Sequence, residues 1–345
     1  MTVSAASSSL PQISDDDARR AAATINRLKR ALEAVLFGQE RLIEMVIVGL
    51  LARGHLLLEG LPGLGKTELV KALSRALELK SSRVQFTPDL LPGDITGNPM
   101  LEETGGQRRF TFHQGPVFTN ILLADEINRA SPKTQSALLE AMQERSVTVM
   151  GQTHALPRPF FVLATQNPIE LEGTYPLPEA QLDRFLFKLD VPVSGVETLE
   201  KIVLNREIGI APDVPRVLDA HALDELHEQV RRVFMPPPVA NLIARLVAGT
   251  QPGAATAAGV RFGASPRAAL ALAAAAKARG LAEGRVNAAY EDVRAVAAPV
   301  LRHRVVLDYA ARLDGLSPDA FVARLVEATP AHDKVLPTSL ADAKV

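Results

Sequence analysis

An eight-residue stretch, residues 60–67, limits what this chain can fold into more than any other part of the sequence. It reads G-L-P-G-L-G-K-T and matches the pattern G-x-x-x-x-G-K-[ST] at every fixed position. The apolar residues 56–58 precede it, and a helix is expected from Lys66 onward. A strand, a glycine-rich turn and a helix in this order predict a phosphate-binding loop. Glycine lets backbone N–H groups turn inward, and the helix N-terminus is electropositive.

Two side chains of this loop and two acids further on predict the chemistry of the site. Lys66 is expected to reach the β- and γ-phosphates of a nucleotide, and the Thr67 hydroxyl is expected to bind Mg²⁺. About 60 residues later, the apolar residues 121–124 lead into Asp125 and Glu126. Asp125 would hold magnesium-bound water, and Glu126 would polarise the attacking water. Strand ends often carry acids, so Asp125 and Glu126 indicate a nucleotide site only because the phosphate-binding loop precedes them.

The order of apolar segments predicts an α/β fold. Short apolar runs alternate with helical stretches, which is typical of a parallel sheet covered by helices on both faces. Beyond about residue 194 the strand signals disappear. We therefore predict a five-stranded parallel αβα core and a small all-helical lid, with the nucleotide in the crevice between them. The apolar runs are 55–59, 83–86, 121–125, 160–166 and 185–191, and the later helices are 195–208, 220–233, 237–249, 265–279 and 290–302.

The same patterns divide the chain into parts. Residues 1–13, rich in Ser and Ala, are expected to form a flexible tail, residues 14–193 the core, and residues 194–345 the lid with a C-terminal tail. Ser14 and the three aspartates after it favour a helix start. Two hairpin insertions are expected in the core, at about 94–118 and about 146–159. The first would interrupt a helix and turn at residues 103–107, where T-G-G suits a turn.

Charge and composition narrow the class of partners. The chain has 38 Lys and Arg against 39 Asp and Glu, so its net charge of −1 disfavours nucleic acid, although a local basic patch is compatible with it. The chain has no cysteine, which excludes disulfides and thiol catalysis and fits a reducing cytosol. We find no signal-peptide pattern and no membrane-spanning run, and we expect a cytoplasmic protein. The seven histidines show no metal-ligand spacing, so zinc is not expected.

Several further motifs make the chain resemble the MoxR family of AAA+ ATPases over about residues 30–310. The likeness is specific because many motifs occur in one order. They are F-G-Q-E at 37–40, the phosphate loop, L-L-P-G-D-I-T-G at 90–97, F-T-F-H-Q-G-P-V at 110–117, D-E-I-N-R-A at 125–130, A-T-Q-N-P at 164–168, P-E-A-Q-L-D-R-F at 178–185 and S-P-R-A at 265–268.

The resemblance implies roles for two polar residues near the phosphates. Asn167 is similar to the sensor that orients water beside the γ-phosphate, with a turn-forming role before Pro168 as the alternative. Arg267 is similar to the second sensor, which reaches the phosphates from the start of a lid helix. The alternative for Arg267 is an exposed arginine in a first helical turn, because Ser265 and Pro266 favour a helix start.

An arginine finger is also implied. Arg184 would enter the nucleotide site of a neighbouring subunit and neutralise charge in the transition state, an effect worth several orders of magnitude in rate. The alternative is a surface ion pair with Asp183 or Glu179, and Arg129 is a rival for the finger.

Gly38 and Gln39 resemble the segment that surrounds the adenine. The implied nucleotide-binding set is Gly38, Gln39, Gly60, Pro62, Gly63, Gly65, Lys66, Thr67, Glu68 and Asp125, with Thr67 and Asp125 serving the metal and Glu126, Asn167, Arg184 and Arg267 serving catalysis.

The family likeness implies ATP and Mg²⁺ as cofactors, a hexameric ring and a chaperone role. Such a protein would mature a partner complex, for instance by metal insertion, often beside a protein with a von Willebrand A domain. The hairpins would line the central pore or brace the interface. The rival functions are a chelatase or DNA-directed motor and a nucleotide-switched scaffold with little turnover. The joint presence of Lys66, Asp125, Glu126 and Asn167 favours turnover.

Overall fold

The computed structural model describes residues 11–61, 63–104, 107–168, 173–207, 210 and 212–331. The predictions for Pro62, for the turn residues 105–106, for residues 1–10 and for residues 332–345 lie outside this part of the chain.

A five-stranded sheet forms the centre of the molecule, as the sequence predicts. Its strand order is β2-β5-β8-β1-β9, and every pairing is parallel. The three central strands are buried almost throughout because helices cover both faces. The strands are β1 (Leu56–Glu59), β2 (Ser81–Gln85), β5 (Ile121–Asp125), β8 (Phe161–Gln166) and β9 (Phe187–Asp190).

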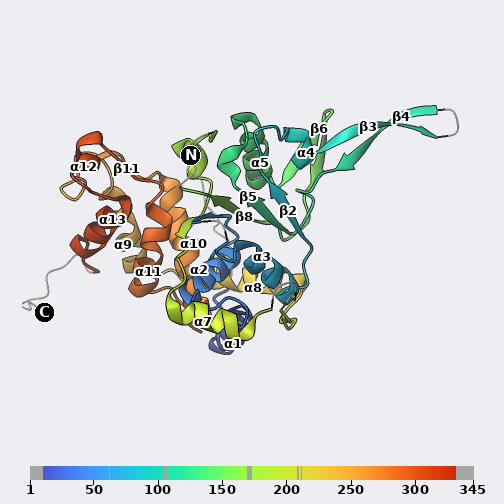
Figure 1. Cartoon of the computed structure of the whole chain (residues 1–345). Coiled ribbons are helices and arrows are strands. Elements are labelled where there is room, and N and C mark those ends of the chain that lie inside the picture. Colours follow the sequence, from blue (N-terminus) through green and yellow to red (C-terminus); the bar gives the residue numbers. More distant parts are fainter. Residues whose placement is uncertain are drawn as a thin grey trace, which may run out of the picture.

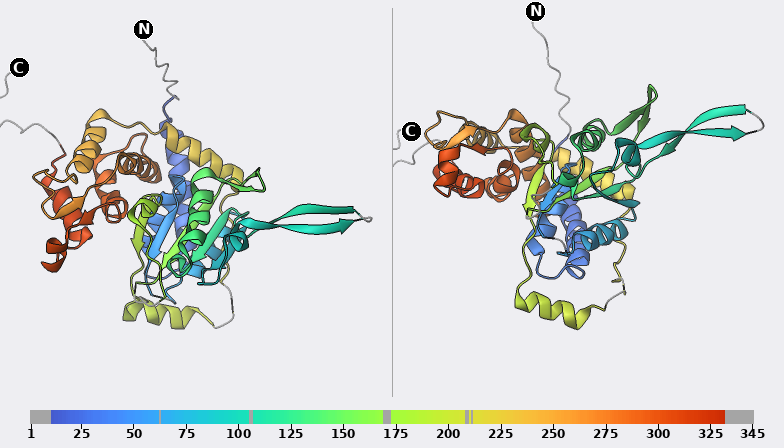
Figure 2. Two further views of the ribbon diagram at one scale, coloured as in Figure 1. Left: turned by 90° about the horizontal axis from the view of Figure 1, so that it is seen from above. Right: turned by 45° about the horizontal axis from the view of Figure 1, so that its top comes forward.

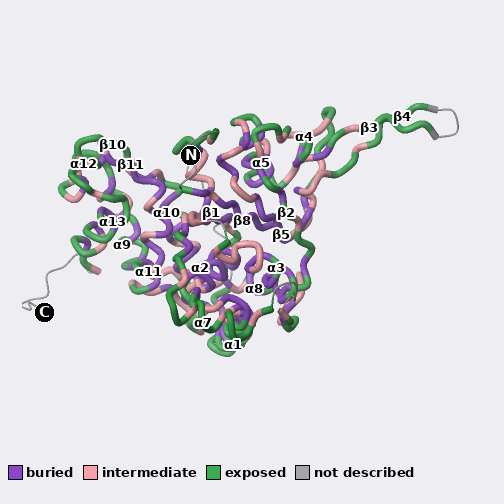
Figure 3. Tube along the Cα trace, viewed as in Figure 1, coloured by how far each residue is buried: buried purple, intermediate pink, exposed green. Residues whose placement is uncertain are grey.

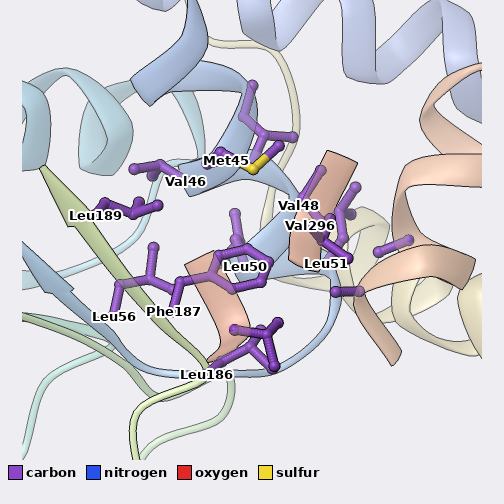
Figure 4. Close-up of a cluster of buried hydrophobic side chains, with 14 of the residues drawn as sticks. Met45, Val46, Val48, Leu50, Leu51, Leu56, Leu186, Phe187, Leu189 and Val296 are labelled. Atoms are coloured by element: carbon purple, nitrogen blue, oxygen red, sulfur yellow. The ribbon is translucent and has the colours of Figure 1, made fainter. Parts of the chain in front are cut away.

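Alternate residues of the strands point into two separate cores. Leu56 and Leu58 of β1 pack with α1 (Asp15–Glu33), α2 (Glu40–Leu51) and α3 (Lys66–Ala76). Leu57 packs on the other side with α4 (Pro92–Thr96) and α5 (Pro132–Glu144). Figure 4 shows the first core, where side chains of α2 meet β1 and β9. This core continues into the lid, so sheet and lid share one hydrophobic interior (Figure 3).

Both predicted hairpins are present. β3 (Gly97–Thr104) and β4 (Gln107–Gln114) form an antiparallel pair that extends away from the body of the molecule (Figure 1). β6 (Ser146–Val149) and β7 (Gln152–Ala155) form the second pair. The expectation that the first hairpin interrupts a helix is wrong, because the five-residue α4 precedes it and the chain then enters β5 directly.

The C-terminal part is helical but not wholly so. A short antiparallel pair joins β10 (Val260–Phe262) to β11 (Val306–Leu307), which corrects the prediction of an all-helical lid. Strands of two and three residues are too short to show an alternating pattern in a sequence. The lid helices are α9 (Pro237–Ala248), α10 (Pro266–Ala282), α11 (Tyr290–Leu301), α12 (Tyr309–Leu313) and α13 (Pro318–Ala328).

Two helices link the sheet to the lid. α7 (Val196–Asn205) has no buried residue and lies at the periphery of the molecule in Figure 2. α8 (Ala220–Arg232) packs against α1, α2 and α10. The end of the predicted flexible tail differs from expectation, because Ile13 is buried and its N–H donates to Arg232 O. Among the described residues, none of the helices combines the length and the apolar character that crossing a bilayer requires.

A buried histidine before β1 couples the fold to pH. His55 Nδ1 accepts from the Val162 N–H at 3.0 Å, and its Nε2 donates to Met142 O at 3.1 Å, so the neutral ring satisfies both contacts. Burial lowers the pKa of His55 from 6.5 to about 4. The unfolded chain therefore binds a proton at this histidine between these two pH values, and the folded chain does not.

We expect His55 to make the fold acid-sensitive. Its contribution is fully present above pH 6.5 and is lost as the pH falls toward 4, in total about 3 kcal/mol of unfolding free energy. Urea unfolding at several pH values measures it. His55→Gln should be less stable at pH 7 but should lose less stability on acidification than the wild type. Parallel pH profiles for the two proteins would contradict this assignment.

Candidate nucleotide-binding site

The phosphate-binding loop joins β1 to α3 in a conformation that requires glycine. Gly63 and Gly65 have φ values of 82° and 80°, a left-handed region that other residues rarely adopt. Nothing lies within 4 Å of a Cβ built on Gly63, so backbone conformation alone explains that glycine. A Cβ on Gly65 would lie 3.2 Å from Leu36 Cδ2. The loop thus presents its backbone at the N-terminus of α3, as the sequence predicts.

Lys66 lies at the start of α3 and points back over the loop. Its Nζ donates to Gly60 O at 2.7 Å. Burial lowers the pKa of Lys66, and the carboxylates of Asp125 and Glu126 oppose this shift. The ammonium therefore lies within the electrostatic reach of both acids. Thr67 and Glu68 follow in the first turn of α3, where Glu68 pairs with Lys71 at 3.0 Å.

Asp125 ends β5 and is held by two neighbouring strands. Thr165 Oγ1 on β8 donates to Asp125 Oδ1 at 2.6 Å. Arg83 on β2 donates to Oδ2 through Nη2 at 2.7 Å and through Nε at 3.2 Å. Neither partner was predicted, because strand register across the sheet, and not sequence spacing, brings them to Asp125.

Glu126 has a left-handed backbone, with φ 55° and ψ 51°. Its N–H donates to Thr165 Oγ1 at 2.8 Å, and its Oε2 accepts from Gln85 Nε2 at 2.8 Å. Oε2 also accepts from Arg129 Nη1 at 3.1 Å, and Arg129 lies in η1 (Ile127–Arg129). Arg129, the rival for the arginine finger, therefore contacts the predicted base of its own chain.

Asn167 lies directly after β8 and is 7% exposed. The residue before it, Gln166, accepts a hydrogen bond from the Gly60 N–H at 3.2 Å. The structure thus places Lys66, Asp125, Glu126 and Asn167 at the carboxyl ends of adjacent parallel strands. This is the edge of an open α/β sheet at which ligands bind.

A cavity of about 440 Å³ opens beside the loop. Leu36, Phe37 and Leu64 line one side, and Ile202 and Ile210 line the other. The wall opposite the loop is thus α7 and the segment after it, within the region 194–345 assigned to the lid. The cavity therefore opens between the predicted core and the region assigned to the lid, although among the described residues none of α9–α13 lines it.

Of the two residues assigned to the adenine, one lines the cavity and the other does not. Gln39 lines the cavity, and its Nε2 donates to Leu64 O at 3.1 Å. Gly38 is not among the described lining residues. A Cβ on Gly38 would lie 2.4 Å from Thr198 Oγ1, and its φ is 68°, so this glycine serves the close approach of α7. Arg206 also lines the cavity, a position that no local sequence signal predicts. Its Cζ lies 5.7 Å from the centroid of the Phe37 ring.

The two remaining predicted arginines meet at a different edge of the sheet. α6 (Glu179–Leu182) leads into Asp183 and Arg184, which precede β9. Arg184 Nη1 donates to Leu139 O of α5 at 2.9 Å. Asp183 instead pairs with Arg267 at 3.5 Å and with Arg304 at 2.7 Å. Arg267 therefore lies beside Asp183, before the amino end of β9, and its role as the second sensor stays a prediction.

Arg304 holds together the segment that precedes β9. Its side chain is 2% exposed. Besides Asp183 Oδ1, it donates to the carbonyl oxygens of Asp183 and Phe185 at 3.1 and 2.6 Å and to that of Leu186 at 3.1 Å. Burial lowers the pKa of Arg304, and the ion pair with Asp183 opposes that shift.

Arg304→Met is expected to destabilise the protein by about 3 kcal/mol, because it leaves several carbonyl oxygens and Asp183 without their charged donor. Urea unfolding measures the loss. Arg267→Met is the matched control, since its side chain is 51% exposed, and it should cost less than about 1 kcal/mol. Equal unfolding free energies for the two variants would show that Arg304 has no special structural role.

Comparisons with known proteins agree with this geometry. Residues 55–187 match the model of the ATPase family associated with various cellular activities, and residues 253–325 match an AAA lid domain. The chain is 43% identical to the chaperone MoxR1 of Mycobacterium tuberculosis, over 89% of this chain and 82% of the relative. It is 34% identical to protein MoxR of Methylorubrum extorquens, over 88% and 94%.

A solved structure shows the same fold. The crystal structure of a candidate ATPase from Cytophaga hutchinsonii superposes with a TM-score of 0.84 at 36% identity, covering 90% of this chain and 96% of that one. The phosphate-binding loop, the acids at the end of β5, the parallel sheet with its lid and these relatives together show that the chain belongs to the MoxR family of AAA+ ATPases.

Proposed function

We propose that this protein hydrolyses ATP with Mg²⁺ and uses the turnover to remodel a partner protein. The observation that carries the proposal is the meeting of Lys66, Asp125, Glu126 and Asn167 at one sheet edge, next to a mainly apolar cavity. The cavity walls suit an adenine ring, and the loop suits the phosphates. Because all four side chains are present, ATP hydrolysis is favoured over a scaffold function in which nucleotide is bound but not hydrolysed.

The residues present fit a nucleotide with its metal. Lys66 Nζ would exchange Gly60 O for phosphate oxygens, since a carbonyl oxygen is the weaker partner for an ammonium. Thr67 and Asp125 supply the oxygen ligands and water contacts that Mg²⁺ prefers. Mg²⁺ would neutralise charge on the phosphates. Glu126 would accept a proton from water while Gln85 and Arg129 fix its carboxylate.

We further propose that the protein works as a ring, with a hexamer expected from the family. Arg184 and Arg267 both lie at Asp183, before the amino end of β9. The P-loop follows the carboxyl end of the adjacent β1. A neighbouring subunit is therefore the natural recipient of both arginines. The relative from Mycobacterium tuberculosis is named a chaperone, which supports a client protein as the target, and a von Willebrand A-domain partner stays an expectation.

A binding and turnover assay tests the proposal. The wild type should release phosphate from ATP, and EDTA should stop the release. Lys66→Ala should bind a fluorescent ATP analogue roughly ten- to a hundredfold more weakly, because one charge-assisted contact is lost. Arg216→Ala, on an exposed side chain that pairs with Glu78, is the control and should bind normally. Tight nucleotide binding without phosphate release, even with the client, would favour the scaffold.

A further inference from the structure

A basic groove lies at the amino ends of the sheet strands, away from the P-loop. A cavity of about 600 Å³ opens between the ends of α2 and α8. A smaller cavity of about 70 Å³ shares Arg53 and His227 with it, and the two cavities together form the basic groove. Arg53 and Arg158 precede β1 and β8 by three residues, which fixes the groove at this edge.

The charged lining of the groove has one sign. Its positive side chains are Arg53, Arg145, Arg158, Arg231, Arg232 and Lys277. Among the described lining residues of both cavities there is no Asp or Glu. This concentration is unexpected in a chain whose net charge is −1.

Few carboxylates neutralise these cations. Glu228 lies near the groove and is shared by Arg53 at 3.1 Å and Arg231 at 2.8 Å. Arg232 donates to Pro11 O at 2.9 Å, and Lys277 donates to Arg231 O at 3.1 Å. These last two bonds use neutral carbonyl oxygens, and the nearby carboxylate of Asp17 compensates part of the charge of Arg232.

Helix ends provide a further, partial neutralisation. The C-termini of α2, α5 and α8 all meet this region, and Arg145 and Arg231 lie at two of them. Each helix C-terminus carries roughly −0.5 charge. Three such ends and Glu228 offset roughly 2.5 of the six positive charges, and Asp17 offsets part of one more at Arg232. A substantial positive potential therefore remains, and the walls of a cleft focus it.

The mutual repulsion of the cations is visible at Arg145. Burial lowers its pKa, and the positive charges of Arg53 and Arg158 lower it further. Arg53 and Arg145 also have φ values of 56° and 51°, a region in which glycine is favoured. The chain thus holds two arginines in a disfavoured backbone conformation and close to each other's charge.

The groove also has an apolar floor. Leu51, Val230, Phe234 and Met235 line it, and Phe234 is 49% exposed. Nucleic acid favours cations arranged along a stripe that follows the phosphates. Here the cations line a depression that apolar side chains also line. This combination matches a short peptide that carries both carboxylates and apolar side chains, because guanidinium groups bind carboxylates in a paired geometry.

We propose that this basic groove binds an acidic segment of a partner protein, one in which Asp or Glu alternates with apolar residues. The site is additional to the nucleotide site and does not depend on hydrolysis. Arg53, Arg231, Arg232 and Lys277 hold the carboxylates, and the apolar floor receives the side chains between them. Such a segment would remain attached at one edge of the sheet while the nucleotide turns over at the other.

Fluorescence anisotropy with the full-length protein tests the proposal. The probe is a labelled dodecapeptide in which Asp and Glu alternate with Leu and Phe. The comparison probe has Asn and Gln at the acidic positions. The wild type should bind the acidic peptide at least tenfold more tightly than the amide peptide, and added salt should weaken the binding. Equal affinity for the two peptides would overturn the proposal.

Variants locate the binding. The double variant Arg53→Gln with Lys277→Gln should bind the acidic peptide at least tenfold more weakly than the wild type. The matched control, Arg19→Gln with Arg27→Gln, removes the same charge from the exposed surface of α1 and should change the affinity less than twofold. If the first double variant unfolds, Arg158→Gln on the exposed rim is used, with at least a threefold loss expected. Unchanged binding in the groove variants, or tighter binding of a single-stranded oligonucleotide, would overturn the proposal.

Discussion

Arg184→Ala is expected to lower ATP turnover by roughly 10³- to 10⁵-fold, the range for losing an arginine that acts on the transition-state charge. The structure indicates that this arginine cannot serve its own site. The Leu186 N–H donates to His55 O at the amino end of β1, whereas the P-loop follows the carboxyl end. Four strand residues separate these ends, roughly 13 Å at 3.3 Å per residue.

Mixing two inactive variants measures this directly. Lys66→Ala subunits keep Arg184, and Arg184→Ala subunits keep an intact P-loop. An equal mixture should recover phosphate release, because a Lys66→Ala subunit can complete the site of its neighbour. Arg129→Ala is the comparison, since Arg129 contacts Glu126 within its own chain. Wild-type turnover by Arg184→Ala alone would assign the finger role elsewhere, with Arg129 as the next candidate.

Glu126→Gln is expected to lower turnover roughly 10²- to 10⁴-fold, the usual contribution of a general base. Nucleotide binding should be unchanged, because the amide has the same size and can still accept from Gln85 or Arg129. Single-turnover phosphate release and binding of a fluorescent ATP analogue separate the two effects.

The control for this change is Glu225→Gln. Glu225 lies on the exposed surface of α8, with a side chain that is 64% exposed, so the same chemical change there should leave turnover within twofold of the wild type. Comparable turnover in Glu126→Gln and Glu225→Gln would remove Glu126 from the proposed mechanism.

Much of the core could be predicted from the sequence because its signals are local. The P-loop glycines, Lys66 and Thr67 belong to one continuous stretch whose backbone conformation depends on residue type. The three central strands appear as apolar runs because helices cover both faces of the sheet, whereas the edge strand β2 is largely polar. The hairpins follow from alternation and turn-forming residues.

The tertiary structure alone decided which distant residues meet these motifs. Thr165, Arg83 and Gln85 reach Asp125 and Glu126 only because β2, β5 and β8 are adjacent and in a fixed register. α7 forms a wall of the cavity, whereas α9–α13 contribute none of its described lining residues. Arg267 lies at Asp183, and Arg53 and Lys277 meet in the basic groove. Side-chain type and spacing determine local backbone structure, whereas such contacts depend on strand order and helix packing, which no short segment of the sequence encodes.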